Sequence, residues 1–312
     1  MNKTTSLFLV LVMASIVLFG CASMSDGKYS AGWSKADPPR TLQLSNGFKI
    51  RYLQTGEGPP LVLIHTIRTQ LDYFEKLVPA LKDHYQVYAL DLPGHGQSTI
   101  LPVEYTETLF RESVTEFITQ LDLHDVTLVG ESIGGTLALT VASELPDRVR
   151  HAIALNPYDH GDKFGGGIRN SRNGWIIGLF DVFGAYTIEP EFVLAAVLKG
   201  GFHNPANLQP ELLHEFYRTG LRPGYRNVEY SVFKNWQTWI EARQVYPRIA
   251  TPVTLIYSDN DWSTVEDREQ TRRALREPEF FTIRDAGHFG SLDKPDKVAN
   301  IILLRGVKQA RK

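Results

Sequence analysis

The sequence lacks several features that assign a function directly. Its 312 residues include a single cysteine, Cys21, which excludes an intramolecular disulfide. The net charge is −2 and no long basic run occurs, which argues against nucleic acid as a partner. No histidine or cysteine pair has metal-ligand spacing, and the glycines at 94–96 and 165–167 lack the context of a phosphate-binding loop. We therefore expect no metal and no cofactor.

Long hydrophobic runs are also scarce, except near the N-terminus. Leu7–Phe19 is uncharged and mostly apolar, but it is too short for a typical membrane span and suits a signal peptide instead. The segment Leu18-Phe19-Gly20-Cys21 resembles a bacterial lipoprotein signal, which implies removal of residues 1–20 and lipidation of Cys21. The alternative is an ordinary signal peptide and a secreted or periplasmic protein.

The resemblance implies a lipid-anchored protein of the cell envelope, on the bacterial outer membrane or its periplasmic face. Residues 21–40 follow the signal and are polar, with glycine, serine and the pair Pro38-Pro39. Such a composition is typical of flexible linkers. We therefore predict that residues 21–40 are a flexible tether between the lipid anchor and the folded part.

Alternating strand and helix patterns run through most of the remaining chain. Short apolar runs such as Leu61–Ile64 are typical of strands covered on both faces, and stretches with helical periodicity such as Leu71–Leu81 separate them. This alternation predicts an α/β fold with a doubly wound, mostly parallel sheet. The alternation stops between residues 159 and 245. We predict a core of residues 41–158 and 246–312, with a mainly helical cap inserted at 159–245 over the carboxyl edge of the sheet.

A serine stands where one predicted strand turns into a helix. The segment Gly130-Glu131-Ser132-Ile133-Gly134-Gly135 follows the apolar run Val126–Val129 and fits the pattern G-x-S-x-G. Glycines on both sides of the serine allow a tight turn that neighbouring Cβ atoms would obstruct. The pattern predicts a hydroxyl held up at the end of the strand, the alternative being an ordinary glycine-rich turn. We expect Glu131 to face solvent or to support the site from behind.

A base and an acid follow in later strand-to-loop segments. Among the nine histidines, only His288 lies in the loop after the last predicted strand, which directs it over the sheet edge. Two carboxylates, Asp259 and Asp261, follow the preceding strand. We expect Asp259 to cap the turn through local backbone bonds and Asp261 to reach His288. A third carboxylate, Asp159, is expected to be a hinge residue where the cap begins.

Four segments together carry a family resemblance: Asp91–Ser98 (DLPGHGQS), Gly130–Gly135, Ser258–Asp261 and Gly287–Phe289. Their order along the chain is similar to that of the α/β-hydrolase superfamily, in its cap-bearing lipase, esterase and dehalogenase-like branch. The resemblance covers about residues 41–307 apart from the cap. It implies Ser132 as nucleophile, His288 as base and Asp261 as the acid that orients the base. Dehalogenases and epoxide hydrolases of this fold carry an aspartate at the nucleophile position, so Ser132 favours acyl transfer.

The expected oxyanion loop departs from the family pattern. That loop usually begins with His-Gly, whereas Thr66 follows the histidine here. Because backbone N–H groups need no particular side chain, the amides of Ile67 and Ile133 are still expected to form the oxyanion hole. Thr66 either narrows the approach or adds a hydroxyl donor. Arg68 is either a solvated loop residue or a group that binds a substrate carboxylate through two hydrogen bonds.

The sequence therefore predicts an enzyme, a carboxylesterase or lipase that forms an acyl-enzyme at Ser132. We expect most of the many aromatic residues of the cap to form its own core and its seam with the sheet, and some of them to line an apolar pocket, which predicts a small, apolar, ester-like substrate. Alternatives with the same residues are a lactonase, a C–C bond hydrolase and a cofactorless haloperoxidase. A binding protein of the cell envelope without activity is a further alternative, because a fold does not determine a function.

Overall fold

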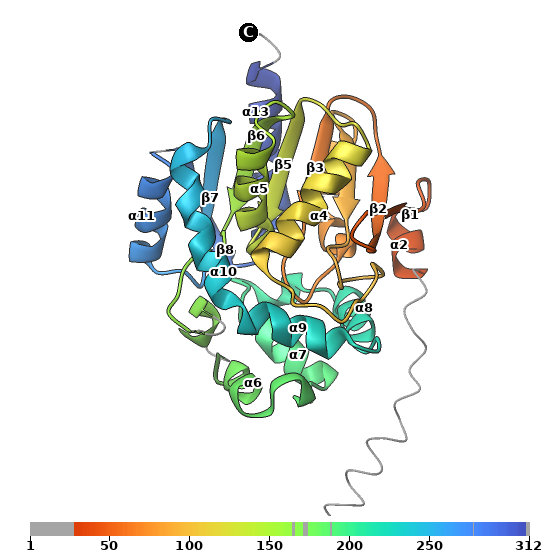
Figure 1. The fold of residues 1–312 in the computed structure, drawn as a ribbon, viewed down its shortest axis with the longest axis vertical. Coiled ribbons are helices and arrows are strands. Elements are labelled where there is room, and N and C mark those ends of the chain that lie inside the picture. Colours follow the sequence, from red (N-terminus) through yellow and green to blue (C-terminus); the bar gives the residue numbers. More distant parts are fainter. Residues whose placement is uncertain (1–27, 164–165, 171–173, 188, 277, 310–312) are drawn as a thin grey trace, which may run out of the picture.

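The computed structural model describes residues 28–163, 166–170, 174–187, 189–276 and 278–309. Its centre is one eight-stranded sheet in the order β1-β2-β4-β3-β5-β6-β7-β8 (Figure 1). The strands are β1 (Arg40–Gln43), β2 (Lys49–Thr55), β3 (Pro60–Ile64), β4 (Gln86–Leu90), β5 (Val126–Glu131), β6 (Val149–Leu155), β7 (Val253–Asn260) and β8 (Glu279–Gly287). β2 is antiparallel to both β1 and β4, whereas all pairs from β4 to β8 are parallel. The predicted α/β fold with a mostly parallel sheet is confirmed.

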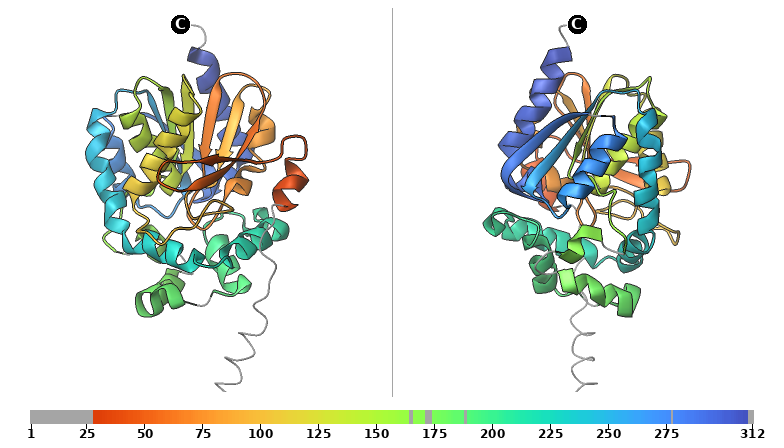
Figure 2. Two further views of the ribbon diagram at one scale, coloured as in Figure 1. Left: turned by 45° about the vertical axis from the view of Figure 1, so that its right-hand side comes forward. Right: turned by 90° about the vertical axis from the view of Figure 1, so that its left-hand side faces the viewer.

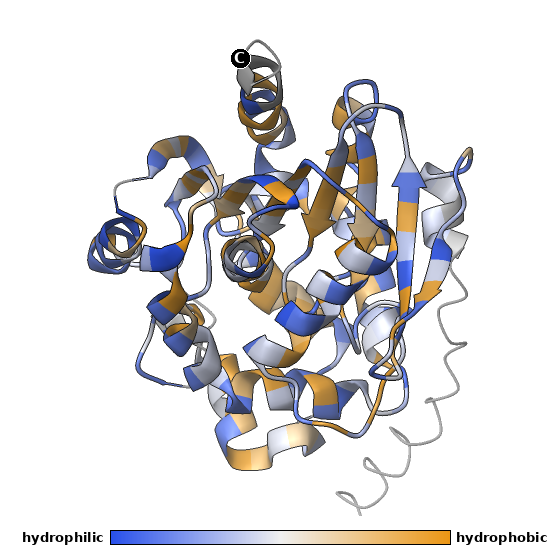
Figure 3. Cartoon of the chain, turned by 45° about the horizontal axis from the view of Figure 1, so that its top comes forward, coloured by the Kyte–Doolittle hydropathy of each residue, from blue (hydrophilic) through white to orange (hydrophobic). Residues whose placement is uncertain are grey.

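Helices cover both faces of this sheet (Figure 2). One apolar cluster joins the sheet to α4 and α5, through residues such as Phe117 and Leu137. The other joins it to α3 and α13, through residues such as Leu81 and Ile302. Figure 3 shows the apolar central strands between helices of mixed hydropathy, as expected for a sheet buried on both faces. The core helices are η1 (Leu71–Phe74), α3 (Val78–Leu81), α4 (Glu107–Gln120), α5 (Ile133–Glu144), α11 (Val265–Ala274), α12 (Gly290–Asp293) and α13 (Pro295–Gln309).

Between β6 and β7 the described residues form helices and no strand. They are η2 (Gly166–Asn170), η3 (Gly174–Ile177), α6 (Gly178–Phe183), η4 (Gly184–Tyr186), α7 (Glu191–Lys199), η5 (Pro205–Asn207), α8 (Pro210–Gly220), α9 (Tyr225–Lys234), α10 (Trp236–Glu241) and η6 (Ala242–Arg248). These helices lie over the carboxyl end of β5, because Ile168 and Phe233 share a pocket with Ser132. We refer to this segment as the cap; its status as a separate domain stays a prediction.

The segment just before β1 differs from the expected flexible tether. Residues from 28 form the helix α2 (Lys28–Trp33), which is docked on the core. Ser30 Oγ and Trp33 Nε1 both donate to Asp72 Oδ1, at 2.8 and 2.7 Å. The polar composition concealed an aromatic pair four residues apart, Tyr29 and Trp33, which occupies one helix face and packs against the core. The tether prediction is therefore wrong for this part.

The signal peptide at 1–20, the lipidation site Cys21 and the first part of the expected tether lie outside the described residues. Among the helices that are described, none combines the length and the apolar composition needed to cross a bilayer.

Candidate active site

Ser132 lies in the turn between β5 and α5, with φ 59° and ψ −121°. Residues with a side chain rarely adopt this conformation, and it persists only where the surroundings enforce it. A Cβ atom on Gly134 would lie 2.1 Å from the Ile64 carbonyl oxygen, and one on Gly130 would lie 1.9 Å from that of Gly134. Both positions therefore require glycine. The tight turn leaves the Ser132 side chain lining a pocket beneath the cap.

Asp261 and His288 are brought together because β7 and β8 are neighbouring parallel strands. His288 Nδ1 lies 2.5 Å from Asp261 Oδ1, and both side chains are buried. Burial opposes ionisation of Asp261, but His288 and the donors of Ser263 outweigh it and lower the pKa of Asp261 to about 2. An ionised carboxylate only accepts hydrogen bonds, so the proton of the imidazole is on Nδ1. Nε2 is then the basic nitrogen.

The two other carboxylates considered from the sequence have different partners. Asp259 accepts the backbone N–H groups of Asp285 and Ala286, at 3.0 and 3.2 Å. It also bonds within its own turn, to Asn260 Nδ2 at 2.7 Å and to the Asn260 backbone, so the expected local bonds are present together with bonds to the neighbouring strand β8. Asp159 is fully buried and accepts Thr271 Oγ1 at 2.9 Å. Neither carboxylate bonds to His288, so the choice of Asp261 as its partner agrees with the geometry.

Two residues that the sequence did not single out fix the position of His288. The indole of Trp262 stacks on the imidazole, with ring centroids 4.2 Å apart and an interplanar angle of 19°. Asn156 Nδ2 donates to the His288 carbonyl at 2.9 Å, while its Oδ1 accepts the Ser258 N–H at 2.8 Å. Trp262 directly follows Asp261, but only the folded turn shows which way its ring faces.

Glu131, beside the serine, is fully buried. It accepts hydrogen bonds from the Tyr73 hydroxyl at 2.8 Å and from the N–H groups of Gly290 and Ser291, at 2.5 and 3.2 Å. Burial raises the pKa of Glu131. The expectation that it faces solvent is wrong, because every residue of the central strand β5 is buried. The alternative expectation, a polar group behind the site, describes its position: it ties the β5 end to the segment after His288.

The backbone amides of Ile67 and Ile133 donate no hydrogen bond to any described residue, and both residues line the pocket beside Ser132. Their loop is held by His65, whose Nε2 accepts the Leu92 N–H at 2.9 Å and whose Nδ1 lies 2.7 Å from the Thr66 carbonyl. Burial lowers the pKa of His65 to about 3, so this imidazole is neutral. Thr66 is buried and lines the pocket as well. Both amides are thus free to donate to an atom in the pocket, and their role as an oxyanion hole stays a prediction.

Arg68 is not a solvated loop residue, because its side chain is buried and its backbone is left-handed, with φ 64°. Nε and Nη2 donate to one oxygen of Glu189 at 2.9 and 2.7 Å, and Nη1 donates to the Phe216 carbonyl at 2.8 Å. Glu229 Oε1 lies 3.7 Å from Nε. All three partners belong to the cap. A substrate carboxylate would have to compete with Glu189, so the binding role predicted for Arg68 stays a prediction.

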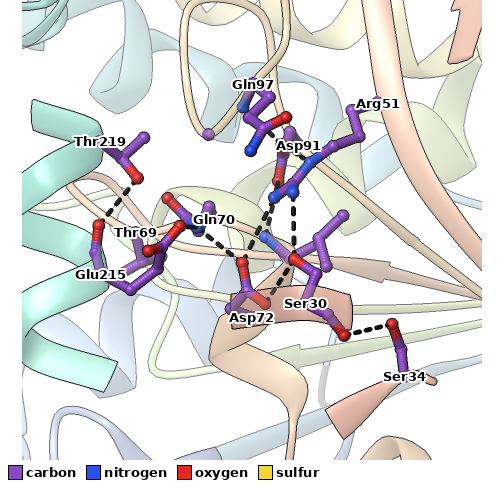
Figure 4. Close-up of polar contacts among 12 residues, drawn as sticks. Ser30, Ser34, Arg51, Thr69, Gln70, Asp72, Asp91, Gln97, Glu215 and Thr219 are labelled. Atoms are coloured by element: carbon purple, nitrogen blue, oxygen red, sulfur yellow. Dashed lines mark hydrogen bonds and ion pairs between the residues drawn. The ribbon is translucent and has the colours of Figure 1, made fainter. Parts of the chain in front are cut away.

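A second buried network supports the same loop from below (Figure 4). Arg51 donates to Asp91 at 2.5 Å and to Asp72 at 3.3 Å. Gln70 Nε2 donates to Asp72 Oδ2 at 2.6 Å and to Glu215 Oε1 of the cap helix α8 at 3.3 Å. The carboxylate of the DLPGHGQS segment therefore anchors an arginine that links the sheet, the loop after β3 and the cap.

The pocket at Ser132 has two lobes that share Ser132, His288 and Trp262. The smaller lobe reaches Tyr158 and His160, whose Nδ1 lies 3.5 Å from Asp159. The larger lobe contains about 510 Å³ of space not filled by atoms. Its walls are mostly aliphatic and aromatic side chains of the cap: Ile168, Ile176, Ile177, Phe180, Leu194, Val197, Leu198 and Phe233.

Comparison with known proteins places this site in a wider context. The family model described as the alpha/beta hydrolase fold matches residues 59–295. An (E)-2-((N-methylformamido)methylene)succinate hydrolase of Acinetobacter baylyi is 39% identical over 117 residues, which are 38% of this chain and 44% of that enzyme. The chain therefore matches less than half of that relative's length. A Haemophilus influenzae protein provisionally named an esterase/lipase is 26% identical over 259 residues, covering 80% of this chain and 83% of that protein.

Solved structures agree with the fold. An esterase from Thermogutta terrifontis has a TM-score of 0.69 at 20% identity and covers 86% of this chain and 98% of its own. A membrane phospholipase A described as a bacterial virulence factor has a TM-score of 0.71 at 23% identity and covers 99% and 98%. At these identities the likeness concerns the fold alone.

Proposed function

Because this chain belongs to the family described as the alpha/beta hydrolase fold, we propose that it is a serine hydrolase that cleaves carboxylic esters. The observation that carries the proposal is the combination at one pocket of three features. These are a strained Ser132, a His288 oriented by the buried Asp261, and the two unpaired amides of Ile67 and Ile133. Acyl transfer needs all three groups together: a nucleophile, a base and an oxyanion site.

In the proposed reaction, His288 Nε2 takes the proton of Ser132 Oγ while Oγ attacks the carbonyl carbon of the ester. The carbonyl oxygen becomes an oxyanion and accepts hydrogen bonds from the two amides. Asp261 stabilises the imidazolium but keeps its own charge. The C–O bond to the alcohol then breaks, and His288 gives its proton to the leaving oxygen. Water attacks the acyl-enzyme, losing a proton to His288, and the acid leaves as Ser132 regains that proton.

The larger lobe supports an apolar, uncharged acyl group as substrate. Its walls are aliphatic and aromatic, and its charged members are already paired within the protein. Arg68 is bound by Glu189, while Arg226 donates to Glu229 at 2.8 Å and to Glu189 at 3.1 Å. A charged acyl group would lose its hydration without gaining a free partner.

The test is labelling with a fluorophosphonate probe, followed by peptide mass spectrometry to locate the adduct. We expect an adduct on Ser132 that disappears in Ser132→Ala and in His288→Ala. His160→Gln is the matched control, because His160 lines the same pocket but faces Asp159. Labelling that survives in His288→Ala, or that is lost in His160→Gln alone, would contradict the proposed roles.

A lipid anchor at Cys21 and a location in the cell envelope form a second part of the proposal. The support is the segment Leu18-Phe19-Gly20-Cys21, which lies outside the described residues. Metabolic labelling with an alkyne fatty acid would test it. We expect incorporation in the wild-type protein and none in Cys21→Ser, and equal incorporation in both would contradict the anchor.

A further inference from the structure

Large apolar side chains are concentrated on the outer surface of the cap. Ten large hydrophobic residues of the described chain are strongly exposed, and five of them fall between residues 175 and 192. We call these five the apolar cap patch: Trp175 (70% exposed), Val182 (74%), Phe183 (55%), Tyr186 (91%) and Phe192 (74%). Single exposed apolar residues are ordinary on soluble proteins, but such a concentration marks an interaction surface.

The helices that carry the patch are apolar on both sides. η3 contacts both α6 and α7, so the three elements form one continuous layer. Their inner side chains, such as Ile176, Phe180 and Leu194, line the larger lobe of the pocket. Their outer side chains belong to the patch. A helix with large apolar residues on two sides is usually buried on both, and no residue that the structure describes covers the outer side.

The position of the N-terminus indicates what covers the other side. The helix α2 lies at the side of the sheet, at the level where the cap begins, whereas α13 ends on the side of the molecule opposite the cap (Figures 1 and 2). The seven steps from Cys21 to Lys28 reach at most about 25 Å, whereas a globule of this length is roughly 50 Å across. The lipid anchor proposed at Cys21 would therefore hold the cap end close to a membrane, and this step rests on that proposal.

The charges around the patch show whether it fits an anionic or an uncharged lipid surface. Asp181 is paired with Arg169 at 2.7 Å, and Glu191 lies 3.2 Å from His214. Among the described residues around the patch, these two pairs balance acidic and basic groups, so the patch offers no described basic cluster that would select anionic lipids. The attraction between the patch and a lipid surface is therefore apolar, and salt, which screens charges, should not weaken it.

We propose that the apolar cap patch docks in the interface of a zwitterionic lipid bilayer, with Trp175 and Tyr186 at the level of the lipid headgroups. The layer formed by η3, α6 and α7 then separates the bilayer from the larger lobe by a single helix thickness. Docking therefore places the pocket where esters dissolved in the membrane can enter it. This last step rests on the proposed ester hydrolysis, whereas the docking itself does not.

Quenching of tryptophan fluorescence tests the docking without activity. The full-length protein is reconstituted into vesicles of phosphatidylcholine with ordinary or brominated acyl chains. We expect brominated lipid to remove about a fifth of the emission, because one of the five tryptophans contacts lipid. Trp175→Phe should abolish this difference, and 0.5 M NaCl should leave it unchanged. Equal emission in both kinds of vesicle would overturn the proposal, because Trp175 would then make no contact with the lipid acyl chains.

Ester hydrolysis provides the second readout. A variant with Trp175→Ser, Phe183→Ser and Phe192→Ser should hydrolyse a vesicle-embedded acyl ester about tenfold more slowly, while hydrolysis of soluble p-nitrophenyl acetate is unchanged. The control carries Val265→Ser and Leu304→Ser, which are equally exposed on the core and should change neither rate.

The outcomes separate the possible failures. Wild-type protein that hydrolyses neither ester would contradict the proposed function and leave the quenching experiment to decide on docking. A wild-type dimer that the triple variant turns into a monomer in sedimentation would overturn docking on lipid, because a second copy of the chain would then cover the patch.

Discussion

The pocket has one wall made by the α/β core and one made by the cap, and they use polar groups differently. On the core wall, Ser132, Asp261 and His288 stand on short turns after parallel strands, and each is held by backbone hydrogen bonds or glycine contacts. On the cap wall, the polar groups Glu189 and Glu229 lie against Arg68, the former in a hydrogen bond of 2.7 Å. The core wall thus carries the groups proposed for the reaction, and the cap wall pairs with Arg68 of the loop after β3 and shapes an apolar space.

The pKa values of two buried carboxylates, Asp261 of the core and Glu229 of the cap, differ in the same sense. His288 and Ser263 lower the pKa of Asp261 to about 2, against the effect of burial. For Glu229, burial and the nearby Glu189 raise the pKa although Arg226 and Arg68 oppose them. The core therefore keeps a stable negative charge next to the imidazole. The cap holds two carboxylates that compete for the same arginines.

The largest expected effect tests the core wall. Asp261→Asn should lower kcat/KM for a soluble ester by about 10⁴-fold, because the imidazole would lose its orienting acceptor and its correct tautomer. The free energy of unfolding is measured in urea. If it is the same in the variant and in the wild type, the loss of kcat/KM reflects the reaction and not the stability of the fold. Asp259→Asn is the matched control on the same turn; it should change kcat/KM by less than about tenfold, since Asp259 bonds only to backbone amides of β8 and to its neighbour Asn260. An equal decrease of kcat/KM in both variants would mean that activity depends on the conformation of the turn and not on the carboxylate of Asp261.

A smaller effect compares packing in the two walls. Gly134→Ala should destabilise the protein by about 1–3 kcal/mol or more, because the added Cβ would lie 2.1 Å from the Ile64 carbonyl oxygen, which belongs to a central strand. Gly178→Ala in α6 of the cap meets no atom within 4 Å and should stabilise it by about 0.5–1 kcal/mol. Urea denaturation of both variants measures the difference. A tolerated alanine at 134 would show that the serine turn is less tightly fixed than its contacts indicate.

Sequence reasoning succeeded where a residue's position follows from a strand end. Ser132, Asp261 and His288 each come directly after a predicted parallel strand, and the carboxyl ends of such strands meet at one edge. It failed where a partner is distant in sequence and no periodicity marks it. Arg68 and Glu189 are separated by 121 residues. The docking of α2 likewise depends on Asp72, 42 residues beyond Ser30. The lining of the pocket could not be assigned either, because aromatic residues of a cap serve its own core as readily as a ligand.

The last prediction concerns Glu229 and is measured as a change of stability with pH. Its folded-state pKa is raised from 4.5 to about 7, so between these values the folded protein holds a proton that the unfolded chain releases. Wild-type stability should therefore fall as pH rises through this window. Glu229→Gln has no proton to lose, so its stability relative to the wild type should increase from pH 5 to pH 7 and then level off. Urea denaturation at pH 5, 6, 7 and 8 measures this change.

Glu104→Gln on the exposed surface is the control. Hydrogen bonds from Asn235 and Lys234 lower the pKa of Glu104, so Glu104 is ionised in both the folded and the unfolded protein from pH 5 to pH 8, and the stability difference from wild type should not vary over this range. Asp261 should behave like Glu104 at more acidic pH, since its stabilising charge is lost only as pH falls from about 4 toward 2. A difference between Glu229→Gln and wild type that does not vary with pH would mean that Arg226 and Arg68 keep Glu229 ionised throughout. The carboxylates of the cap would then be ionised like Asp261 of the core, and the two walls would differ in the shape of their surfaces but not in the ionisation of their carboxylates.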